Sequence, residues 1–329
     1  MSRKVTIVAY HFVRELPYTR YPAIKGLLTS EFKEQLAYLK KYYTFVTIGD
    51  CLRSLSDESD LPLNACLLTF DDGYIDHFTT VFPILEENRI RGCFFPPAKA
   101  ILTHEVLGVN KIHFILASAS KDINQLISDI YACLDKYRSA YQLESNSHYY
   151  SRLAVKSRFD PAEISFVKRL LQMELEENVR KLITDELFQK YVTRDEKSFS
   201  RELYMDLDQI KCMSRNGMYI GSHGFDHLWL NKLAPERQRA EIDGSLEFLG
   251  LVNAPTRNWV MCYPYGAYND YLIEILREKG CSLAFTTKID ITDISRENAY
   301  TLERLDTNDF PKLSDAEANS WTKKVMNNE

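Results

Sequence analysis

The sequence lacks the features that mark membrane proteins, nucleic-acid binders and disulfide-stapled domains. No run approaches the roughly 20 consecutive apolar residues that a transmembrane helix needs. The net charge is −5 and the basic residues are scattered, so no basic stripe points to a nucleic-acid partner. The seven cysteines include no Cys-x-x-Cys pair, and an odd, unpatterned set is typical of reduced thiols.

The amino terminus also lacks the marks of an export signal. Its apolar run, Val5–Tyr10, is too short for a signal-peptide core and has no small-residue cleavage site after it. The composition, 45% hydrophobic and 26% charged, is that of a globular protein. We therefore expect a cytoplasmic protein with no transmembrane segment and no nucleic-acid partner.

Two common catalytic signatures are missing as well. The chain has neither a Gly-rich phosphate loop nor a Gly-x-Ser-x-Gly nucleophile elbow. Their absence argues against a P-loop nucleotide hydrolase and against a serine hydrolase of the α/β-hydrolase type. The chemistry must come from other residues.

The hydrophobic pattern alternates between short strands and amphipathic helices along most of the chain. Such alternation predicts an α/β fold with parallel strands, and about seven or eight strand–helix units close naturally into a distorted (β/α) barrel. A doubly wound open sheet is the alternative. The predicted strands are Val5–Tyr10, Thr44–Ile48, Cys66–Phe70, Cys93–Phe95, Met218–Gly221, Trp259–Tyr263, Leu283–Thr286 and Tyr300–Leu305.

One region interrupts this alternation. Residues 104–206 are highly charged and helical in their apolar spacing, with few strand signals. We expect residues 1–103 and 207–329 to form the two parts of a barrel, with 104–206 as a helical insertion. The insertion could act as a lid, support the substrate, or bind a partner, including a second copy in a homo-oligomer.

The first segment with chemical interest is Leu67–Tyr74, where an apolar strand ends in Asp71, Asp72 and Gly73. Side chains of neighbouring strand residues point to opposite faces, but a glycine permits a sharp turn that brings both carboxylates into one cavity. At the carboxyl end of a barrel strand, that cavity is where active sites form. The alternative is structural: Asp-Gly is a common turn, and an Asp can cap the next helix.

The second segment is Ser222–His227, with histidines four residues apart. On a helical turn, His223 and His227 would face the same way and could hold one metal ion. Gly224 stands where zinc proteases with this spacing have a glutamate, so a thermolysin-like mechanism is disfavoured. Two surface histidines near a helix start remain the alternative.

Together the two segments supply a complete set of groups for hydrolysis. Catalytic zinc typically has three protein ligands, a role that Asp72, His223 and His227 would fill. Asp71 then remains as a base that removes a proton from water. The sequence predicts a divalent metal ion, zinc before cobalt or nickel.

These strings resemble a known family. Thr69-Phe-Asp-Asp-Gly-Tyr74 and Ser222-His-Gly-x-x-His227 are similar to the first two motifs of the polysaccharide deacetylases, the NodB-homology family (carbohydrate esterase family four). A third string, Cys262-Tyr-Pro-Tyr-Gly266, is similar to a variant of the family's third motif. The resemblance implies a distorted (β/α) barrel and metal-dependent hydrolysis of the acetamido group of a sugar. It also implies that the Tyr265 backbone amide stabilises the oxyanion.

The chain departs from the family pattern in two places. Cys262 stands where many members have an arginine that orients the base, and no histidine follows His227 to serve as the general acid. Arg304, near the end of the last predicted strand, could pair with Asp71 instead. His11, at the end of the first strand, could protonate the leaving amine, because the first and last strands of a closed barrel are neighbours. The alternatives are a buried structural His11 and an Arg304 engaged in a surface ion pair.

We therefore predict a metal-dependent N-deacetylase that acts on an N-acetylated sugar or sugar precursor in surface-polysaccharide or glycan synthesis. Its catalytic residues would be His11, Asp71, Tyr265 and Arg304. A deformylase of a formamido sugar would use the same groups. A catalytically silent sugar-binding or assembly protein with the same barrel is the alternative from another class.

Overall fold

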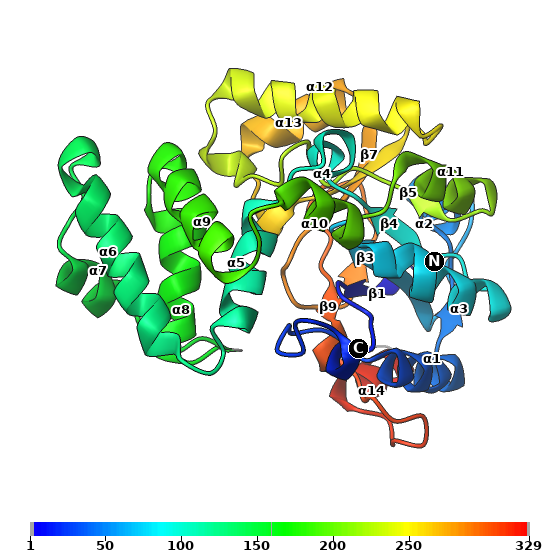
Figure 1. The fold of residues 1–329 in the computed structure, drawn as a ribbon. Coiled ribbons are helices and arrows are strands. Elements are labelled where there is room, and N and C mark those ends of the chain that lie inside the picture. Colours follow the sequence, from blue (N-terminus) through cyan, green and yellow to red (C-terminus); the bar gives the residue numbers. More distant parts are fainter. Residues whose placement is uncertain (1–2, 159, 328–329) are drawn as a thin grey trace. The chain divides into compact units, whose positions relative to one another are not determined.

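The computed structural model describes residues 3–158 and 160–327, which divide into two compact units (Figure 1). The barrel unit comprises the described parts of Met1–Glu15, Gly26–Thr103 and Arg201–Glu329. The helical unit comprises the described parts of Leu16–Lys25 and His104–Ser200. A short segment from early in the chain therefore belongs with helices that follow much later.

Parallel strands form the main sheet of the barrel unit. β1 (Lys4–Tyr10) pairs with β3 (Ala65–Asp71), β3 with β4 (Cys93–Phe95), and β4 with β5 (Tyr219–Ile220). The short β2 (Thr44–Phe45) adds to β3. Because these strands run the same way, their carboxyl ends, including the end of β3 at Asp71, meet at one edge of the sheet.

The sheet is closed into a ring by isolated bridges. β6 (Trp259–Cys262) and β7 (Cys281–Phe285) form a parallel pair. Ser222 bridges to Met261 at one edge of this pair, and Phe285 bridges to Leu302 at the other. β9 (Leu305–Asp306) then returns to β1. The predicted distorted barrel is confirmed, and the doubly wound alternative is not.

The strand predictions differ from the structure near the carboxyl end. The predicted strand Tyr300–Leu305 is mostly irregular, and only the bridge at Leu302 and β9 pair with neighbours. The short β8 (Thr292–Asp293), which was not predicted, runs antiparallel to β1. The segment before β9 still forms backbone hydrogen bonds with β7 and the residues after it, such as Leu302 N–H to Ala284 C=O and Thr286 N–H to Leu302 C=O.

The interior of the barrel is apolar, and helices surround it. Inward-facing side chains such as Ile7, Leu67, Phe95, Val260 and Phe285 form one cluster. The surrounding helices are α1 (Thr29–Tyr42), α2 (Ile48–Leu55), α3 (Phe82–Glu87), α4 (Ala98–Thr103), α11 (Leu207–Arg215), α12 (Pro235–Leu251), α13 (Asp270–Glu278) and α14 (Ser320–Met326).

Local sequence accounts for individual helix boundaries. The Asn269 side chain accepts a hydrogen bond from the Leu272 N–H at the start of α13, and Gly280 follows the end of the helix with φ +75°. The apolar face of α13 buries Leu272 and Ile275. Cap, stop and apolar spacing agree, so this helix could be read from the sequence.

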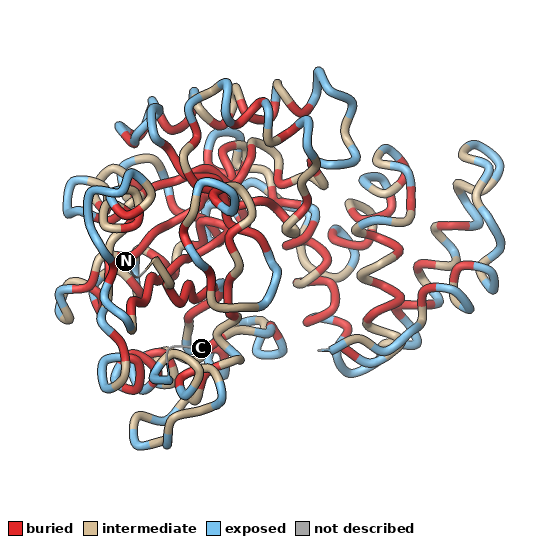
Figure 2. The backbone as a smooth tube through the Cα atoms, turned by 180° about the vertical axis from the view of Figure 1, so that it is seen from behind, coloured by how far each residue is buried: buried red, intermediate tan, exposed pale blue. Residues whose placement is uncertain are grey.

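The helical unit has a core of its own. It contains α5 (Gly108–Ser118), α6 (Ile123–Tyr141), α7 (Asn146–Leu153), α8 (Ala162–Arg169), α9 (Glu177–Tyr191) and the first part of α10 (Glu196–Leu203). Phe114, Phe166 and Phe188 are buried within it. Figure 2 shows buried segments along the strands of the barrel unit and along one side of the helices of the helical unit.

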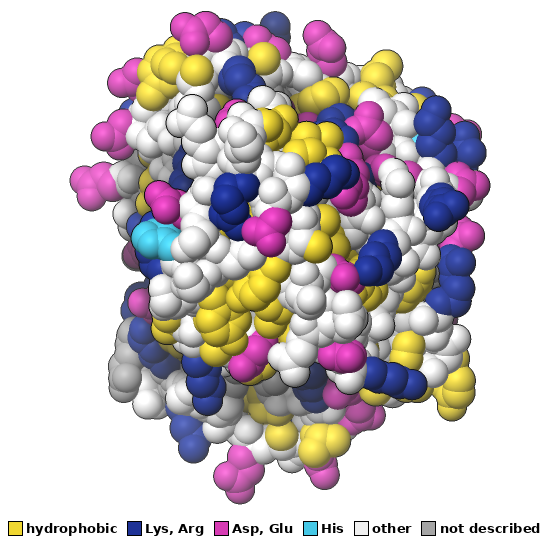
Figure 3. Space-filling view, turned by 60° about the vertical axis from the view of Figure 1, so that its left-hand side comes forward, with side chains coloured by type: hydrophobic (Ala, Val, Ile, Leu, Met, Phe, Trp, Pro, Cys, Tyr) yellow, Lys and Arg dark blue, Asp and Glu magenta, His cyan; other side chains and the backbone are white. Residues whose placement is uncertain are grey.

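The surface carries mixed charge. On the face drawn in Figure 3, positive and negative side chains alternate between small apolar patches. Of the helices in the described parts of the chain, none combines the length and the apolar character that a membrane crossing requires.

Candidate active site

The end of β3 brings two adjacent carboxylates into one buried place. Asp71 ends the strand, and Asp72 and Gly73 follow with φ +74° and +67°. Left-handed backbone at a non-glycine residue is uncommon and costs of order 1–3 kcal/mol, so it persists only where surrounding contacts hold it. A Cβ on Gly73 would lie 2.7 Å from the Pro96 Cβ, which explains the glycine. Asp71 and Asp72 are 2% and 3% exposed.

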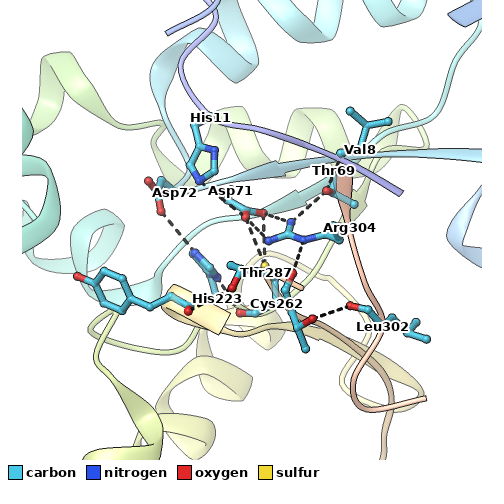
Figure 4. Close-up of polar contacts among 12 residues, drawn as sticks. Val8, His11, Thr69, Asp71, Asp72, His223, Cys262, Thr287, Leu302 and Arg304 are labelled. Carbon is cyan, nitrogen blue, oxygen red and sulfur yellow. Dashed lines mark hydrogen bonds and ion pairs between the residues drawn. The ribbon is translucent and has the colours of Figure 1, made fainter. Parts of the chain in front are cut away.

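Asp72 lies between the two histidines of the second motif. Its Oδ1 is 3.4 Å from His223 Nε2 and 3.3 Å from His227 Nε2. Its Oδ2 accepts a hydrogen bond of 2.6 Å from the Tyr74 hydroxyl. The Nδ1–H of His223 donates to the Cys262 carbonyl at 2.7 Å, which turns Nε2 toward Asp72 (Figure 4).

The histidine pair lies on an irregular loop and not on the helical turn that its spacing predicted. Gly224 and His227 have φ +74° and +51°, which a helix excludes. The loop is held by a buried carboxylate: Glu241 of α12 accepts hydrogen bonds from the N–H groups of Phe225 and Asp226, at 3.1 and 2.9 Å. The convergence of the two imidazoles therefore depends on a residue from another element.

Asp71 is paired with Arg304. The guanidinium donates to both carboxylate oxygens, at 3.0 and 2.7 Å, and also to the Thr69 hydroxyl and the Thr286 carbonyl. Burial alone would raise the pKa of Asp71, but the Arg304 charge holds it well below its usual range. Arg304 is 5% exposed, so the alternative of a surface ion pair is wrong.

His11 faces the same carboxylate from the other side. Its Nε2 lies 4.0 Å from Asp71 Oδ2, and 48% of its side chain is exposed. The exposure contradicts a buried core histidine, and the position suits a group that exchanges protons with a bound substrate. β1 ends at Tyr10, one residue earlier, so the strand delivers His11 to the edge where β3 ends.

Tyr265 lies in a strained turn beside the histidines. In the turn Pro264–Gly266 it has φ +58°. Its ring stacks on Trp229, with centroids 4.4 Å apart and planes within 3°, and meets His227 edge-on at 4.7 Å. Asp72, His227 and Tyr265 are thus three left-handed non-glycine residues around one centre, which is typical of functional sites.

Two residues that the sequence analysis did not assign to the site also lie there. The Cys262 thiol is 3.4 Å from both oxygens of Asp71, and burial raises its pKa, so it stays a protonated donor. His77 is fully buried, with Nε2 2.9 Å from the His11 carbonyl. The third motif pointed to a place for Cys262 near the base, whereas nothing in the sequence pointed to the contact of His77 with His11.

The donor atoms fit a divalent cation. In the described residues two sets of three donors lie within 4.8 Å of one another: Asp72, His223 and His227, and Asp71, His223 and Cys262. Asp71 is already engaged by Arg304. Asp72 Oδ1 is buried and, within residues 3–158 and 160–327, has no hydrogen-bond partner. One carboxylate with two imidazoles suits zinc and similar ions, so the first set is the better candidate.

The chain shares sequence with a known protein family. The family profile of the polysaccharide deacetylases matches residues 183–284, which contain the second and third motifs. The resemblance to the polysaccharide deacetylases is confirmed. YxkH of Bacillus subtilis, assigned to that family by its name, is 31% identical over 93 residues, which are 28% of this chain and 33% of YxkH.

A second relative carries a substrate in its name. The poly-β-1,6-N-acetyl-D-glucosamine N-deacetylase of Escherichia coli is 42% identical over 59 residues, which are 18% of this chain and 9% of that protein. The alignments therefore span about a third and about a tenth of these relatives.

Solved structures of deacetylases share the fold over almost the whole chain. The Streptococcus pyogenes deacetylase PplD has a TM-score of 0.57 at 16% identity, covering 100% of this chain and 99% of that one. IcaB from Ammonifex degensii has a TM-score of 0.53 at 19% identity, covering 99% and 97%. At such identities the likeness concerns the fold.

Proposed function

We propose that this protein is a metal-dependent N-deacetylase that releases acetate from an N-acetylated amino sugar. The observation that carries the proposal is the pairing of a three-donor cluster, Asp72, His223 and His227, with a separate buried carboxylate, Asp71. The three-donor cluster is suited to bind a cation, and the Asp71 carboxylate is suited to accept a proton. The polysaccharide deacetylase relatives support an N-acetylated sugar polymer as the substrate class.

The metal would be held by Asp72, His223 and His227, with zinc as the first choice and cobalt or nickel as alternatives. When bound, a divalent cation supplies Lewis-acid polarisation of the amide carbonyl and acidifies water. His223 is oriented for this role by its bond to the Cys262 carbonyl.

The remaining steps belong to the chain's own side chains. Asp71 takes a proton from water as the new C–O bond forms at the amide carbon, and Arg304 keeps that carboxylate ionised and oriented. The Tyr265 amide is the proposed donor to the oxyanion. His11 gives its proton to the nitrogen as the C–N bond breaks, leaving acetate and a free amine.

The cysteines bear on the compartment in which the protein acts. All seven cysteines are free thiols in the structure, which supports a reducing compartment. In such a compartment a sugar precursor, linked to a nucleotide or a lipid, is a second candidate substrate beside the polymer. Comparison of a nucleotide-linked N-acetylglucosamine with N-acetylglucosamine oligomers separates precursor from polymer.

The test measures acetate release and metal content for wild type and Asp71→Asn. The panel contains a β-1,6-linked N-acetylglucosamine oligomer, a β-1,4-linked oligomer and a nucleotide-linked N-acetylglucosamine, each with added zinc, cobalt or nickel. Asp71→Asn should retain metal and lose at least 100-fold in rate, since a general base contributes about 10²–10⁴-fold. Asp60→Asn, an exposed carboxylate of the same unit, is the matched control and should behave as wild type.

Two alternatives give different results in the same experiment. Formate release from an N-formyl sugar, faster than acetate release from its N-acetyl analogue, would indicate a deformylase. A wild-type protein that binds metal and sugar but releases neither acid from any substrate would support a silent sugar-binding or assembly protein.

A further inference from the structure

His77 is a buried imidazole that the proposed reaction does not use. It is 0% exposed and opens the wide, π-helical turn η2 (His77–Val81). Single π-helical turns occur frequently at functional sites. The rings of Phe70, Tyr74 and Phe94 surround it, each with its centroid 5.7 Å away. An apolar side chain would fill such an aromatic box at less cost than an imidazole.

The protonation of His77 follows from its one strong contact. Nε2 lies 2.9 Å from the His11 carbonyl oxygen, which can only accept, so Nε2 carries the hydrogen. Burial lowers the pKa of His77 to about 4, so the ring is neutral and Nδ1 is an acceptor. Among the described residues Nδ1 has no hydrogen-bond partner, and leaving a buried polar atom unpaired is unfavourable. A buried imidazole with an unpaired nitrogen therefore suggests a role for the hydrogen bond that its other nitrogen makes.

The hydrogen bond from His77 fixes the backbone of His11. The ladder between β1 and β3 ends at the pair Tyr10–Phe70. The His11 carbonyl lies one residue beyond the ladder, where it contacts His77. His11 carries the imidazole that faces Asp71 at 4.0 Å. A carbonyl without a partner would let the end of the strand rotate, and the imidazole would turn with it.

Neighbouring contacts dock the same stretch of chain onto the residues around His77. The Phe12 ring stacks on Tyr74 with centroids 3.8 Å apart, and Arg14 Nε lies 2.6 Å from Asp76 Oδ2. Residues 11–14 thus contact residues 74–77 at three points. Tyr74 in turn donates to Asp72, so the residue that would give the proton and a residue that would hold the cation share one rigid support.

We propose that His77 is a positioning residue: its Nε2–H holds the His11 carbonyl, and through it the His11 imidazole, at the leaving nitrogen. This role rests on the proposed N-deacetylase function. It predicts that loss of the His77 donor slows amide hydrolysis but not ester hydrolysis, because His11 would be needed only when the leaving group requires a proton. An amine leaves an amide with a proton, whereas 4-nitrophenolate leaves an acetate ester without one.

The test compares two substrates, a β-1,6-linked N-acetylglucosamine oligomer and 4-nitrophenyl acetate. His77→Phe keeps a ring but removes the donor, and should lower kcat on the amide about 10- to 100-fold, the scale for an approximately 1 Å misplacement. Its rate on the ester should stay within about 3-fold of wild type, since no proton is delivered there. His77→Gln keeps an N–H donor of similar reach and should restore most of the amide rate.

Two further variants separate positioning from general loosening of the fold. Val81→Ala removes buried packing at the other end of the same turn and leaves the His77 donor in place, so it should leave the amide-to-ester ratio of kcat unchanged. The double variant His11→Ala/His77→Phe should be no slower on the amide than His11→Ala alone, because His77 acts only through His11. If the phenyl ring overfills the box, His77→Leu replaces His77→Phe.

The outcomes distinguish this inference from the proposed function. An active wild type whose amide-to-ester ratio is unchanged in His77→Phe, or a double variant with additive losses, would overturn the positioning role alone. A wild type that releases acetate from no N-acetyl sugar would overturn both. A lower ratio in His77→Phe, restored in His77→Gln, supports the assignment.

Discussion

Burial of His77 should make the stability of the barrel unit depend on pH in a measurable way. The side chain has a pKa of about 4 in the folded protein, against 6.5 for the free group. The folded state therefore binds the proton less tightly than the unfolded state. Between pH 6.5 and 4, unfolding takes up a proton, so the free energy of unfolding falls as the pH falls.

The size of this effect follows from the two pKa values. Relative to pH 8, the His77 contribution at pH 5 amounts to a loss of about 2 kcal/mol. The loss would reach about 3 kcal/mol well below pH 4. The carboxylates that act on the pKa of His77 through their charge, Asp71 and Asp72, remain in a His77→Gln variant. Their own titration largely cancels when the variant and the wild type are compared.

The assay is urea unfolding of wild type and His77→Gln at pH 8, 7, 6 and 5, with ionic strength constant and a chelator present. Tryptophan fluorescence reports on the barrel unit alone, because Trp229, Trp259 and Trp321 all lie in it. The difference in free energy of unfolding, wild type minus variant, should fall by about 2 kcal/mol from pH 8 to pH 5. A difference that stays constant across this range would refute the buried, neutral imidazole.

Three further perturbations have defined outcomes. Arg304→Met leaves the Asp71 charge buried and uncompensated, so urea unfolding should show a loss of about 3–5 kcal/mol, which Asp71→Asn in the same chain partly recovers. Asp72→Asn removes the only carboxylate of the three-donor cluster and should lower bound metal per chain after dialysis against zinc, as measured by elemental analysis. Gly266→Ala adds a Cβ 2.3 Å from the Thr287 Oγ1 at φ +67°, so the turn must shift and amide hydrolysis should fall while the circular dichroism spectrum is kept.

The chemistry-bearing strings could be found in the sequence because each is local. An apolar strand that ends in Asp71-Asp72-Gly73 requires a turn at that point, and the structure has consecutive left-handed residues there. The alternation of strands and helices likewise predicted the barrel, since apolar periodicity records which face of each element is buried. The eighth predicted strand, Tyr300–Leu305, was mostly wrong because its apolar spacing did not reveal that it pairs at isolated points.

Other features could not be read from any local pattern. The helical spacing of His223 and His227 suggested a helix, but Glu241 holds them on a loop from a distant element. The burial of His77 depends on rings contributed by β3, β4 and the loop between them, and such a set of partners leaves no local pattern in the sequence. Residues 16–25 pack with helices that follow much later, with Tyr21 edge-on to Phe114 at 5.0 Å.

The sequence by itself determined the kinds of groups at the site, two carboxylates and two imidazoles, because short motifs record residue types and local turns. The tertiary structure decided between the two alternatives for Arg304, which pairs with Asp71. It also showed contacts that the sequence did not give: the Cys262 thiol beside Asp71, and His77 behind His11. These contacts join residues 66 to 233 positions apart, and the choice among such partners depends on how the closed barrel orients each strand end.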